Sequence, residues 1–381
     1  MLKLRKATVR EAHLAHAAEQ ELVVECDDGT RRPAIADVSL HGLCRPEDEV
    51  IVNVQALDLG LGSGGFDVLH VNLTRGLSAE GTPGAHVMKL NYSSLQHAVA
   101  SVEEETLELP IERPIAVLGL HGQLAAVAFA FSEQHPGARL GFVQTPGGAL
   151  PGSRSRTVAM LRERGLLAGH ITSGASYGGE GEAITTAGAI HHGIRTLGWD
   201  AAICGPGPGI VGSRSPLGHG GLYALDSAHA ALALGAPTLL VARMSSADTR
   251  PRHRGVSHHT LTVLDLLLEP VTVALPAGIR TPVGADLRAT LGSVFGAPSP
   301  GGLPQLALDV DRPTGRDPAS LTRHDWRRAP IDLPAYLRSG LPAVTMGRGL
   351  VQDPLFFAAA LAGGAALAEL CELAGAHAEA H

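Results

Sequence analysis

The chain has 381 residues, which is enough for two or three domains of ordinary size. Its 45% of hydrophobic and 18% of charged residues are typical of a globular protein. The net charge of −7 and the aromatic content of 3% exclude a general nucleic-acid binder, because such proteins need a basic footprint and stacking surfaces.

The cysteines and the chain start indicate the cellular compartment. The four cysteines are widely spaced: Cys26, Cys44, Cys204 and Cys371. This spacing excludes a disulfide framework and a zinc ribbon, and it fits a reducing cytosol. Residues 1–6 are basic but precede no apolar run, so they do not form a signal peptide. We therefore expect a cytoplasmic protein.

The most apolar stretch, residues 354–367, is too short for a membrane span of about 20 residues. It predicts a packed C-terminal helix with Asp353 as N-cap and Pro354 as first helical residue. No membrane partner is expected, and the composition leaves homo-oligomer formation open.

Residues 1 to about 80 predict a small β-barrel of five to six strands, within an N-terminal domain of residues 1–110. The expected strands are 4–9, 22–26, 34–38, 50–54 and 66–71. Asp27-Asp28-Gly29-Thr30 predicts a hairpin turn between the second and third. The glycine-rich stretch 59–65 is expected to be a barrel corner rather than a phosphate loop, because no helix follows it.

From about residue 113 the pattern changes to alternating strands and helices. The expected strands are 115–120, 140–144, 169–173, 201–204, 238–241 and 271–275, with helices between them, and 306–310 and 343–346 are expected to complete the sheet. Continuous apolar strands indicate a sheet that is covered on both faces. Residues 111–381 therefore predict a Rossmann-like α/β domain with a mostly parallel sheet and helices on both faces.

In such a sheet, ligands bind beyond the carboxyl ends of the strands. The loops there are unusually long, spanning residues 145–156, 174–181, 205–221 and 243–257. The links from helix to strand are short by comparison, as at 198–200 and 235–237. We therefore expect these long loops to converge on one edge and to form a ligand site.

The loop after the fifth strand carries the clearest signal. Its arginines are opposed only by Asp248: Arg243, Arg250, Arg252 and Arg254. Ser257 is expected to cap a helix that opens with His258 and His259. Arginines beside a helix N-terminus predict a phosphate or carboxylate site, in which either histidine transfers protons. The alternative is a solvated basic loop.

The loop after the fourth strand contains the spacing of a dinucleotide fingerprint, in Gly207, Gly209 and Gly212. No helix starts directly after it, and Arg243 rather than an acidic residue ends the next strand. We therefore expect a backbone cradle for another anion, extending to Ser213. The sequence identifies neither a cofactor nor a metal.

Four further ionisable residues each carry a separate prediction. His121 follows the first strand of the α/β domain and is expected to point into the cleft as a catalytic candidate. Glu180 is a candidate general base or metal ligand, and without ligand it is expected to pair with a loop arginine. Glu182 is interpreted as complementing a helix N-terminus. His229 shares a helix face with leucines and is interpreted as a buried or half-buried core histidine.

Four segments carry a family resemblance: Leu59-Gly-Leu-Gly-Ser-Gly-Gly65, His86-Val-Met-Lys-Leu90, Gly207-Pro-Gly-Ile-Val-Gly212 and Arg252-His-Arg-Gly-Val-Ser-His-His-Thr260. Together they resemble an uncharacterised bacterial family, Domain of Unknown Function 3866, nearly end to end. The resemblance implies a bacterial, cytoplasmic protein and supplies no activity, substrate or catalytic residue.

Two hypotheses remain. In the first, the protein is an enzyme that acts on a small anionic metabolite, such as a phosphorylated one, bound at the carboxyl edge of the sheet. In the second, a non-catalytic sensor binds the same ligand. Catalysis needs a base or nucleophile within hydrogen-bond reach of the anion, whereas a sensor needs only the binding site.

Overall fold

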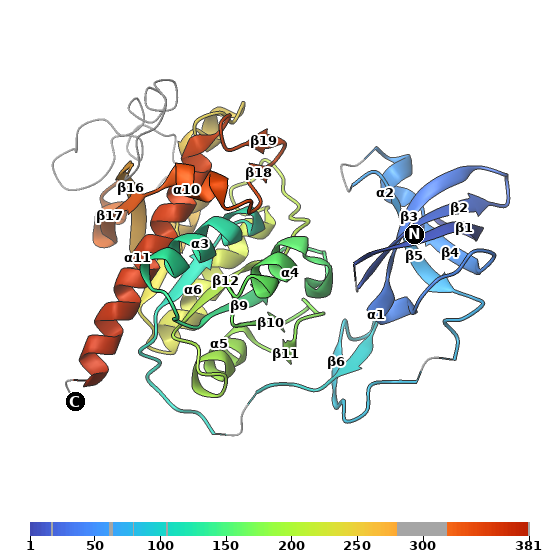
Figure 1. The fold of residues 1–381 in the computed structure, drawn as a ribbon, viewed down its shortest axis with the longest axis horizontal. Coiled ribbons are helices and arrows are strands. Elements are labelled where there is room, and N and C mark those ends of the chain that lie inside the picture. Colours follow the sequence, from blue (N-terminus) through green and yellow to red (C-terminus); the bar gives the residue numbers. More distant parts are fainter. Residues whose placement is uncertain (17, 61–63, 79, 104–105, 280–317, 380–381) are drawn as a thin grey trace. The chain divides into compact units, whose positions relative to one another are not determined.

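The computed structural model describes residues 1–16, 18–60, 64–78, 80–103, 106–279 and 318–379 (Figure 1). The chain divides into two compact units, Met1–Ala100 and Ser101–His381. The division lies before residue 110 because the segment that starts at Ser101 pairs with the second unit. The backbone N–H of Val102 donates to the carbonyl of Glu182 at 2.9 Å.

The first unit contains a closed five-stranded barrel in the order β1-β2-β3-β5-β4, as predicted. Its strands are β1 Leu4–His16, β2 Glu19–Cys26, β3 Arg31–Asp37, β4 Glu49–Asn53 and β5 Asp67–Asn72. Alternate residues such as Val9, Val24 and Val52 fill its core. At the predicted hairpin turn, Gly29 has φ 79° and its N–H donates to the carbonyl of Cys26 at 2.8 Å.

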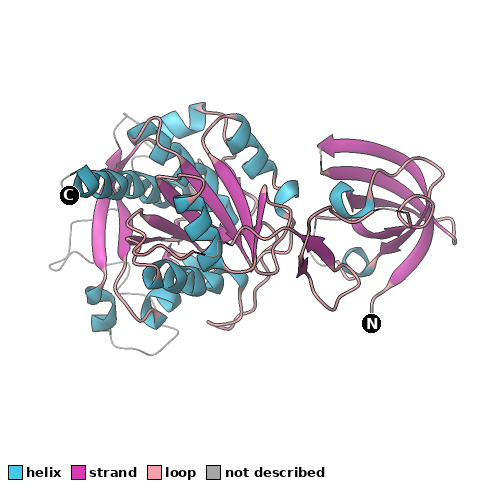
Figure 2. Cartoon of the chain, turned by 90° about the horizontal axis from the view of Figure 1, so that it is seen from below, coloured by secondary structure: helices cyan, strands magenta, loops and turns pink. Residues whose placement is uncertain are grey.

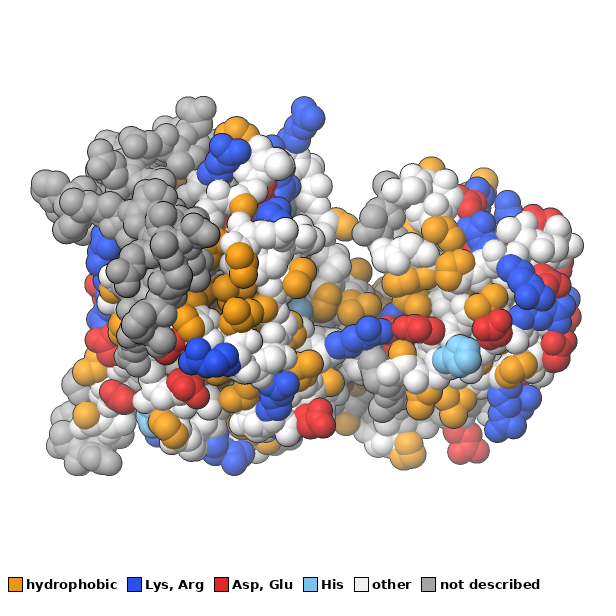
Figure 3. All heavy atoms as spheres, turned by 45° about the horizontal axis from the view of Figure 1, so that its top comes forward, with side chains coloured by type: hydrophobic (Ala, Val, Ile, Leu, Met, Phe, Trp, Pro, Cys, Tyr) orange, Lys and Arg blue, Asp and Glu red, His pale blue; other side chains and the backbone are white. Residues whose placement is uncertain are grey.

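The remaining elements of the first unit are short. They are α1 Val38–His41, α2 Gln55–Asp58, and the hairpin of β6 Val87–Lys89 and β7 His97–Val99. Charges of both signs are interspersed on the face of this unit that Figure 3 shows. Lys6 pairs with Glu49, and Arg10 pairs with Glu47, at 2.8 Å each. Each of these two ion pairs joins β1 to a residue at or just before β4.

The second unit is built on an eight-stranded parallel sheet in the order β11-β10-β9-β12-β8-β13-β16-β17. Its strands are β8 Ile115–Leu118, β9 Leu140–Thr145, β10 Gly169–Ser173, β11 Gly181–Ala183, β12 Ala201–Pro206, β13 Thr238–Val241, β16 Thr272–Ile279 and β17 Asp325–Ile331. The predicted Rossmann-like architecture is confirmed.

Helices cover both faces of this sheet (Figure 2). One apolar cluster joins the sheet to α3 Leu124–Gln134, α4 Arg156–Glu163, α10 Leu333–Arg338 and most of α11 Pro354–Glu379. A second cluster joins the other face to α5 Thr186–Arg195, α6 Tyr223–Ala233 and α7 His258–Leu266. The sheet is therefore buried on both sides, as its continuous apolar strands predict.

The strand order fixes where a ligand can enter. The helices after β8 and β9 lie in one apolar cluster, and those after β12 and β13 lie in the other. These four strands are neighbours, in the order β9-β12-β8-β13. Their connections therefore separate to opposite faces at the carboxyl edge, which is where open parallel sheets bind ligands.

The structure corrects two sequence predictions and adds one strand. Glu182 lies on edge strand β11 and not in a helix. Edge strand β17 is not predicted, because Asp-Trp-Arg-Arg-Ala-Pro-Ile lacks the apolar run of a central strand. Val344–Thr345 (β18) pairs with Arg348–Gly349 (β19) in a separate hairpin, so it does not complete the sheet. The expected strand 306–310 lies outside the described residues.

Helix α11 begins at Pro354 as predicted and is long and apolar enough to span a membrane, yet 89% of its apolar window is buried inside the protein. It is therefore a core helix. A Cβ atom added to Gly364 would lie 2.2 Å from the carbonyl oxygen of Val127 on α3, so the two helices touch there. Asp353 directly precedes the helix. Its side chain accepts from Ser245 Oγ at 2.6 Å, so this hydrogen bond reaches the loop after β13 and not the helix backbone.

Candidate functional site

The long loops converge on the carboxyl edge of the sheet, as predicted. Leu150, after β9, donates its N–H to the carbonyl of Pro208, after β12, at 3.2 Å. His121, after β8, lies with Nδ1 3.2 Å from the carbonyl oxygen of Pro206. The rings of His219 and His259 stack at 3.4 Å and join the loop after β12 to α7.

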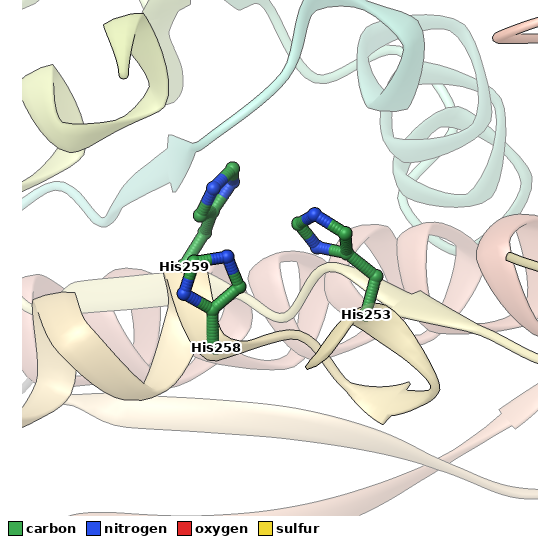
Figure 4. A group of neighbouring side chains, drawn as sticks. All are labelled: His253, His258 and His259. Atoms are coloured by element: carbon green, nitrogen blue, oxygen red, sulfur yellow. The ribbon is translucent and has the colours of Figure 1, made fainter. Parts of the chain in front are cut away.

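Four histidines gather at this edge and are called the histidine cluster: His219, His253, His258 and His259. Ser257 caps α7 as predicted, since its hydroxyl accepts from the N–H of His259 at 3.3 Å. The first turn of α7 therefore carries His258 and His259, and the short turn η4 Pro251–His253 carries His253. The ring centroid of His253 lies 4.8 Å from those of His258 and His259, and the latter two centroids lie 4.3 Å apart (Figure 4).

The ring nitrogens of the histidine cluster are only partly satisfied by the protein. Arg243 Nη1 donates to His259 Nδ1 at 3.1 Å, and His253 Nδ1 lies 2.8 Å from Ser257 Oγ. The Nε2 atoms of His253 and His258 are buried and have no partner among the described residues. Buried polar atoms are normally paired, so these two nitrogens need an explanation.

Burial keeps the cluster uncharged. Burial, followed by the charge of Arg243, lowers the pKa of His219 to about 4 and that of His253 to about 3. Burial, followed by the charge of Arg252, lowers the pKa of His258 to about 4. The pKa of His259 is lowered as well, first by burial. At neutral pH these imidazoles are therefore neutral and can accept a proton, donate one N–H or bind a metal.

A buried carboxylate organises most of the nearby arginines. Asp248 is 0% exposed and binds Arg250 through both oxygens, at 2.9 and 2.8 Å. Arg348 lies 3.4 Å and Arg243 lies 3.5 Å from the same carboxylate. Burial alone raises the pKa of Asp248, but the hydrogen bonds from Arg250 outweigh it and lower that pKa. Arg250, expected to hold an anion, is thus paired within the protein.

Arg252 and Arg254 differ in their contacts. Exposed Arg254 donates its Nε to the carbonyl of Asp248 at 2.9 Å. Arg252 is half-buried, and its Nε is buried without a partner among the described residues. Its charge lowers the pKa of His258, so it lies within electrostatic reach of that ring. The Nε of Arg254 is therefore used within the protein, whereas the buried Nε of Arg252 has no partner among the described residues.

The glycine-rich loop after β12 folds back on itself. Ser213 donates its N–H to the carbonyl of Gly218 at 2.7 Å, and Gly220 donates to Val211 at 2.9 Å. Gly212 pairs with His219 across the same turn. Gly209 has φ 85°, and Gly207 packs so closely on Gln144 that a Cβ atom would lie 2.4 Å from Nε2. The glycines therefore permit a tight turn, and the amide of Ser213 is already used.

His121 forms a separate buried pair. Its Nε2 lies 2.9 Å from the hydroxyl of Ser155, which also caps α4 by accepting from Val158 N–H at 3.2 Å. Burial lowers the pKa of His121 to about 4. Its ring lies 6.0 Å from that of Phe142. His121 thus points into the protein at the carboxyl edge, where its contacts among the described residues are with Pro206, Ser155 and Phe142 and not with the histidine cluster.

Glu180, Glu182 and His229 lie away from the cluster. Exposed Glu180 pairs with Arg162 of α4 at 2.6 Å, so it does not pair with an arginine of the 243–257 loop. Glu182 accepts from the N–H of Gly178 at 2.6 Å, a loop contact instead of one at a helix N-terminus. His229 is half-buried, and its Nε2 accepts from Leu268 N–H at 3.2 Å, which agrees with the structural interpretation.

Sequence reasoning missed four residues of the site: His219, His253, Arg348 and Asp353. The first two lie in the long loops; His253 stands five residues before His258 in the sequence, whereas His219 has no histidine close to it in the sequence. Asp353 accepts from Ser246 N–H at 2.8 Å and from Arg348 Nε at 3.1 Å. These two residues are about 100 positions from the loop they support, so no local pattern could reveal them.

The family whose model matches residues 33–364 is described as "Protein of unknown function (DUF3866)". No curated protein and no solved structure matches the chain.

Proposed function

Because the chain belongs to the DUF3866 family of proteins of unknown function, we propose its function from the site alone: an enzyme that acts on a small anionic metabolite at the carboxyl edge of the sheet. In this proposal Arg252 binds the anionic group, and the histidine cluster contacts the reacting part. Phosphate and carboxylate are the groups that a guanidinium binds best, through paired charge-assisted hydrogen bonds.

The observation that carries the proposal is the set of unpartnered buried nitrogens. The Nε2 atoms of His253 and His258 and the Nε of Arg252 have no hydrogen-bond partner among the described residues. Leaving one buried polar group unpaired costs about 1–3 kcal/mol. A bound ligand that supplies acceptors or takes lone pairs at these atoms removes this cost, whereas a purely structural role for the cluster leaves it in place.

The charge balance supports an anion in particular. Asp248 is shared by Arg243, Arg250 and Arg348, and Asp353 also contacts Arg348. These two carboxylates therefore face three arginines before Arg252 is counted. Burial and the nearby positive charge both lower the pKa of His258. An anion beside Arg252 offsets the excess positive charge.

The setting that we propose is a bacterial cytoplasm. All four cysteines are free and buried, which fits a reducing compartment.

A thermal-shift screen of the purified full chain against phosphorylated and carboxylated metabolites tests the proposal, followed by calorimetry and a turnover assay for each hit. We expect Arg252→Ala to weaken binding at least about tenfold, since one charge-assisted bond contributes about 1.5–3 kcal/mol. The matched control is Arg139→Ala. Arg139 donates to the carbonyl of Leu197 at 3.0 Å, before β12, at the opposite edge of the sheet.

Equal losses in the two variants, or no loss in Arg252→Ala, would contradict the anion site. Tight binding of a metabolite that is never converted would identify a sensor in place of an enzyme.

A further inference from the structure

We propose that His253, His258 and His259 bind a divalent transition-metal ion, which places a Lewis acid beside the anionic group of the ligand. The inference rests on the proposed function for that second ligand, although metal binding itself is measured separately. It changes the expected role of the histidines from proton transfer to metal coordination.

The geometry points to a metal because three ligand atoms lie close together. One ring nitrogen from each of these histidines lies within 4.8 Å of the other two. Nitrogen ligands about 2.1 Å from a tetrahedral zinc ion are about 3.4 Å apart, so ring movements of about 1 Å complete the site. The first turn of α7 and the neighbouring turn η4 supply all three rings (Figure 4).

The hydrogen bonds of His253 match those of a metal ligand. Its Nδ1 lies 2.8 Å from Ser257 Oγ, and its Nε2 is buried without a described partner. A histidine that binds a metal through one nitrogen commonly donates its other N–H to a fixed acceptor, which orients the ring. The hydroxyl of Ser257 is such an acceptor, and it is held at the N-terminus of α7.

The donor set selects the metal class. Three neutral imidazoles suit zinc, cobalt, nickel, copper or iron, whereas calcium and magnesium require oxygen ligands.

His259 requires one exchange. Arg243 Nη1 donates to His259 Nδ1 at 3.1 Å, which leaves the ring proton on Nε2. Coordination by His259 through Nδ1 therefore displaces Arg243 Nη1 and leaves the proton on Nε2. Arg243 Nη2 already lies 3.5 Å from Asp248, so the buried carboxylate is in place to accept the released guanidinium.

The arginines make metal and anion binding cooperative. Positive charge from Arg243 and Arg252 opposes a cation at the cluster, just as it lowers the pKa of His258. A phosphate beside Arg252 offsets that charge. Each ligand therefore increases the affinity for the other by the same factor.

The test uses the full chain, purified without a histidine tag and freed of metal by chelation. Zn²⁺ binding is followed by calorimetry, and Co²⁺ binding by its visible absorption, each with and without inorganic phosphate. We expect one equivalent of metal, at least about 100-fold weaker binding in His258→Ala, and tighter binding with phosphate. The matched control, His229→Gln, keeps an acceptor for Leu268 N–H and should bind metal normally.

X-ray absorption on the zinc-loaded wild-type protein gives an answer even where a histidine variant fails to fold, and we expect scattering from three imidazoles. Absence of stoichiometric metal binding, or binding that is unchanged in both His253→Ala and His258→Ala, would overturn the metal site. Metal binding without any response to phosphate or phosphorylated metabolites would keep the metal site and contradict the proposed anion function.

Discussion

The loops after β12 and β13 lie at one edge of the same sheet, yet they are built in opposite ways. Residues 209–218 are largely exposed, and the loop bonds to itself, as between Ser213 and Gly218. The 243–257 loop buries Asp248 and His253 and binds distant residues such as Arg348. Glycine spacing therefore indicates a turn, whereas buried charged and titratable groups indicate where a functional site lies.

The largest expected effect comes from the carboxylate at the centre of the buried loop. Asp248→Asn removes the charge that Arg243, Arg250 and Arg348 share. Breaking a buried ion pair from one side costs about 3–5 kcal/mol, and we expect a loss of that size in urea unfolding. The same measurement on Ser213→Ala in the exposed loop should change stability by less than about 0.5 kcal/mol. Similar losses in both variants would contradict the difference between the two loops.

Two buried histidines, His121 and His170, are expected to make the stability of the protein depend on pH. Burial lowers the pKa of His121 to about 4 and that of His170 to about 3, while unfolded histidine titrates near 6.5. Below pH 6.5 the unfolded chain binds protons that the folded chain does not, so stability falls as the pH falls. At pH 5 the expected loss is about 2 kcal/mol for each ring.

His170→Phe isolates one of these rings. His170 stacks on Phe142 at 5.3 Å, and the charge of Arg162 also lowers its pKa, so phenylalanine keeps the stacking and removes the titration. The stability difference between pH 8 and pH 5, measured by urea unfolding, should shrink by about 2 kcal/mol. An unchanged pH profile would show that this ring does not control it.

Two glycines differ in how closely they are packed: Gly148 in the loop after β9, which touches Gly207, and Gly209 in the exposed loop after β12. In Gly148→Ala the new Cβ atom would lie 2.1 Å from the carbonyl oxygen of Gly207, and we expect a loss of about 1–3 kcal/mol. In Gly209→Ala the nearest atom is 3.5 Å away, so only the positive φ of 85° costs energy, about 1 kcal/mol. Thermal unfolding of both variants gives the order, and a reversed order would contradict close packing at Gly148.

The smallest expected effect on stability is that of Arg252→Ala. Arg252 has no ion pair among the described residues, so unfolding should change by less than about 0.5 kcal/mol. Its effect on anion binding is expected to be about tenfold, as described above. A marked loss of stability with unchanged anion binding would make Arg252 a structural residue.

Much of the fold follows from local patterns. The apolar strands around Val117 and Ile203 predict a doubly covered parallel sheet, and the turn at Gly29 predicts the barrel hairpin. Strands β11 and β17 are edge strands, so they need less apolar surface and lack the signal that central strands carry.

The site is predictable only where its residues are local. Ser257 as an N-cap and the histidines of α7 follow from one short segment. Arg250 pairs with Asp248, whereas the Nε of Arg252 is buried without a partner among the described residues, and this difference depends on side-chain geometry that a sequence does not contain. Arg348 reaches Asp248 from 100 positions away, and only the folded sheet brings them together.

The position of α11 determines the order in which the second unit can be completed on the ribosome. The helix packs on α3, β13, β16 and β17, all of which precede it in the chain. Until it emerges, apolar residues such as Val127 and Phe131 face solvent on that side of the sheet, and such surfaces bind chaperones. The barrel strands lie within residues 4–72 and can close much earlier. We therefore expect the nascent chain to need chaperones mainly while its second unit is being synthesised.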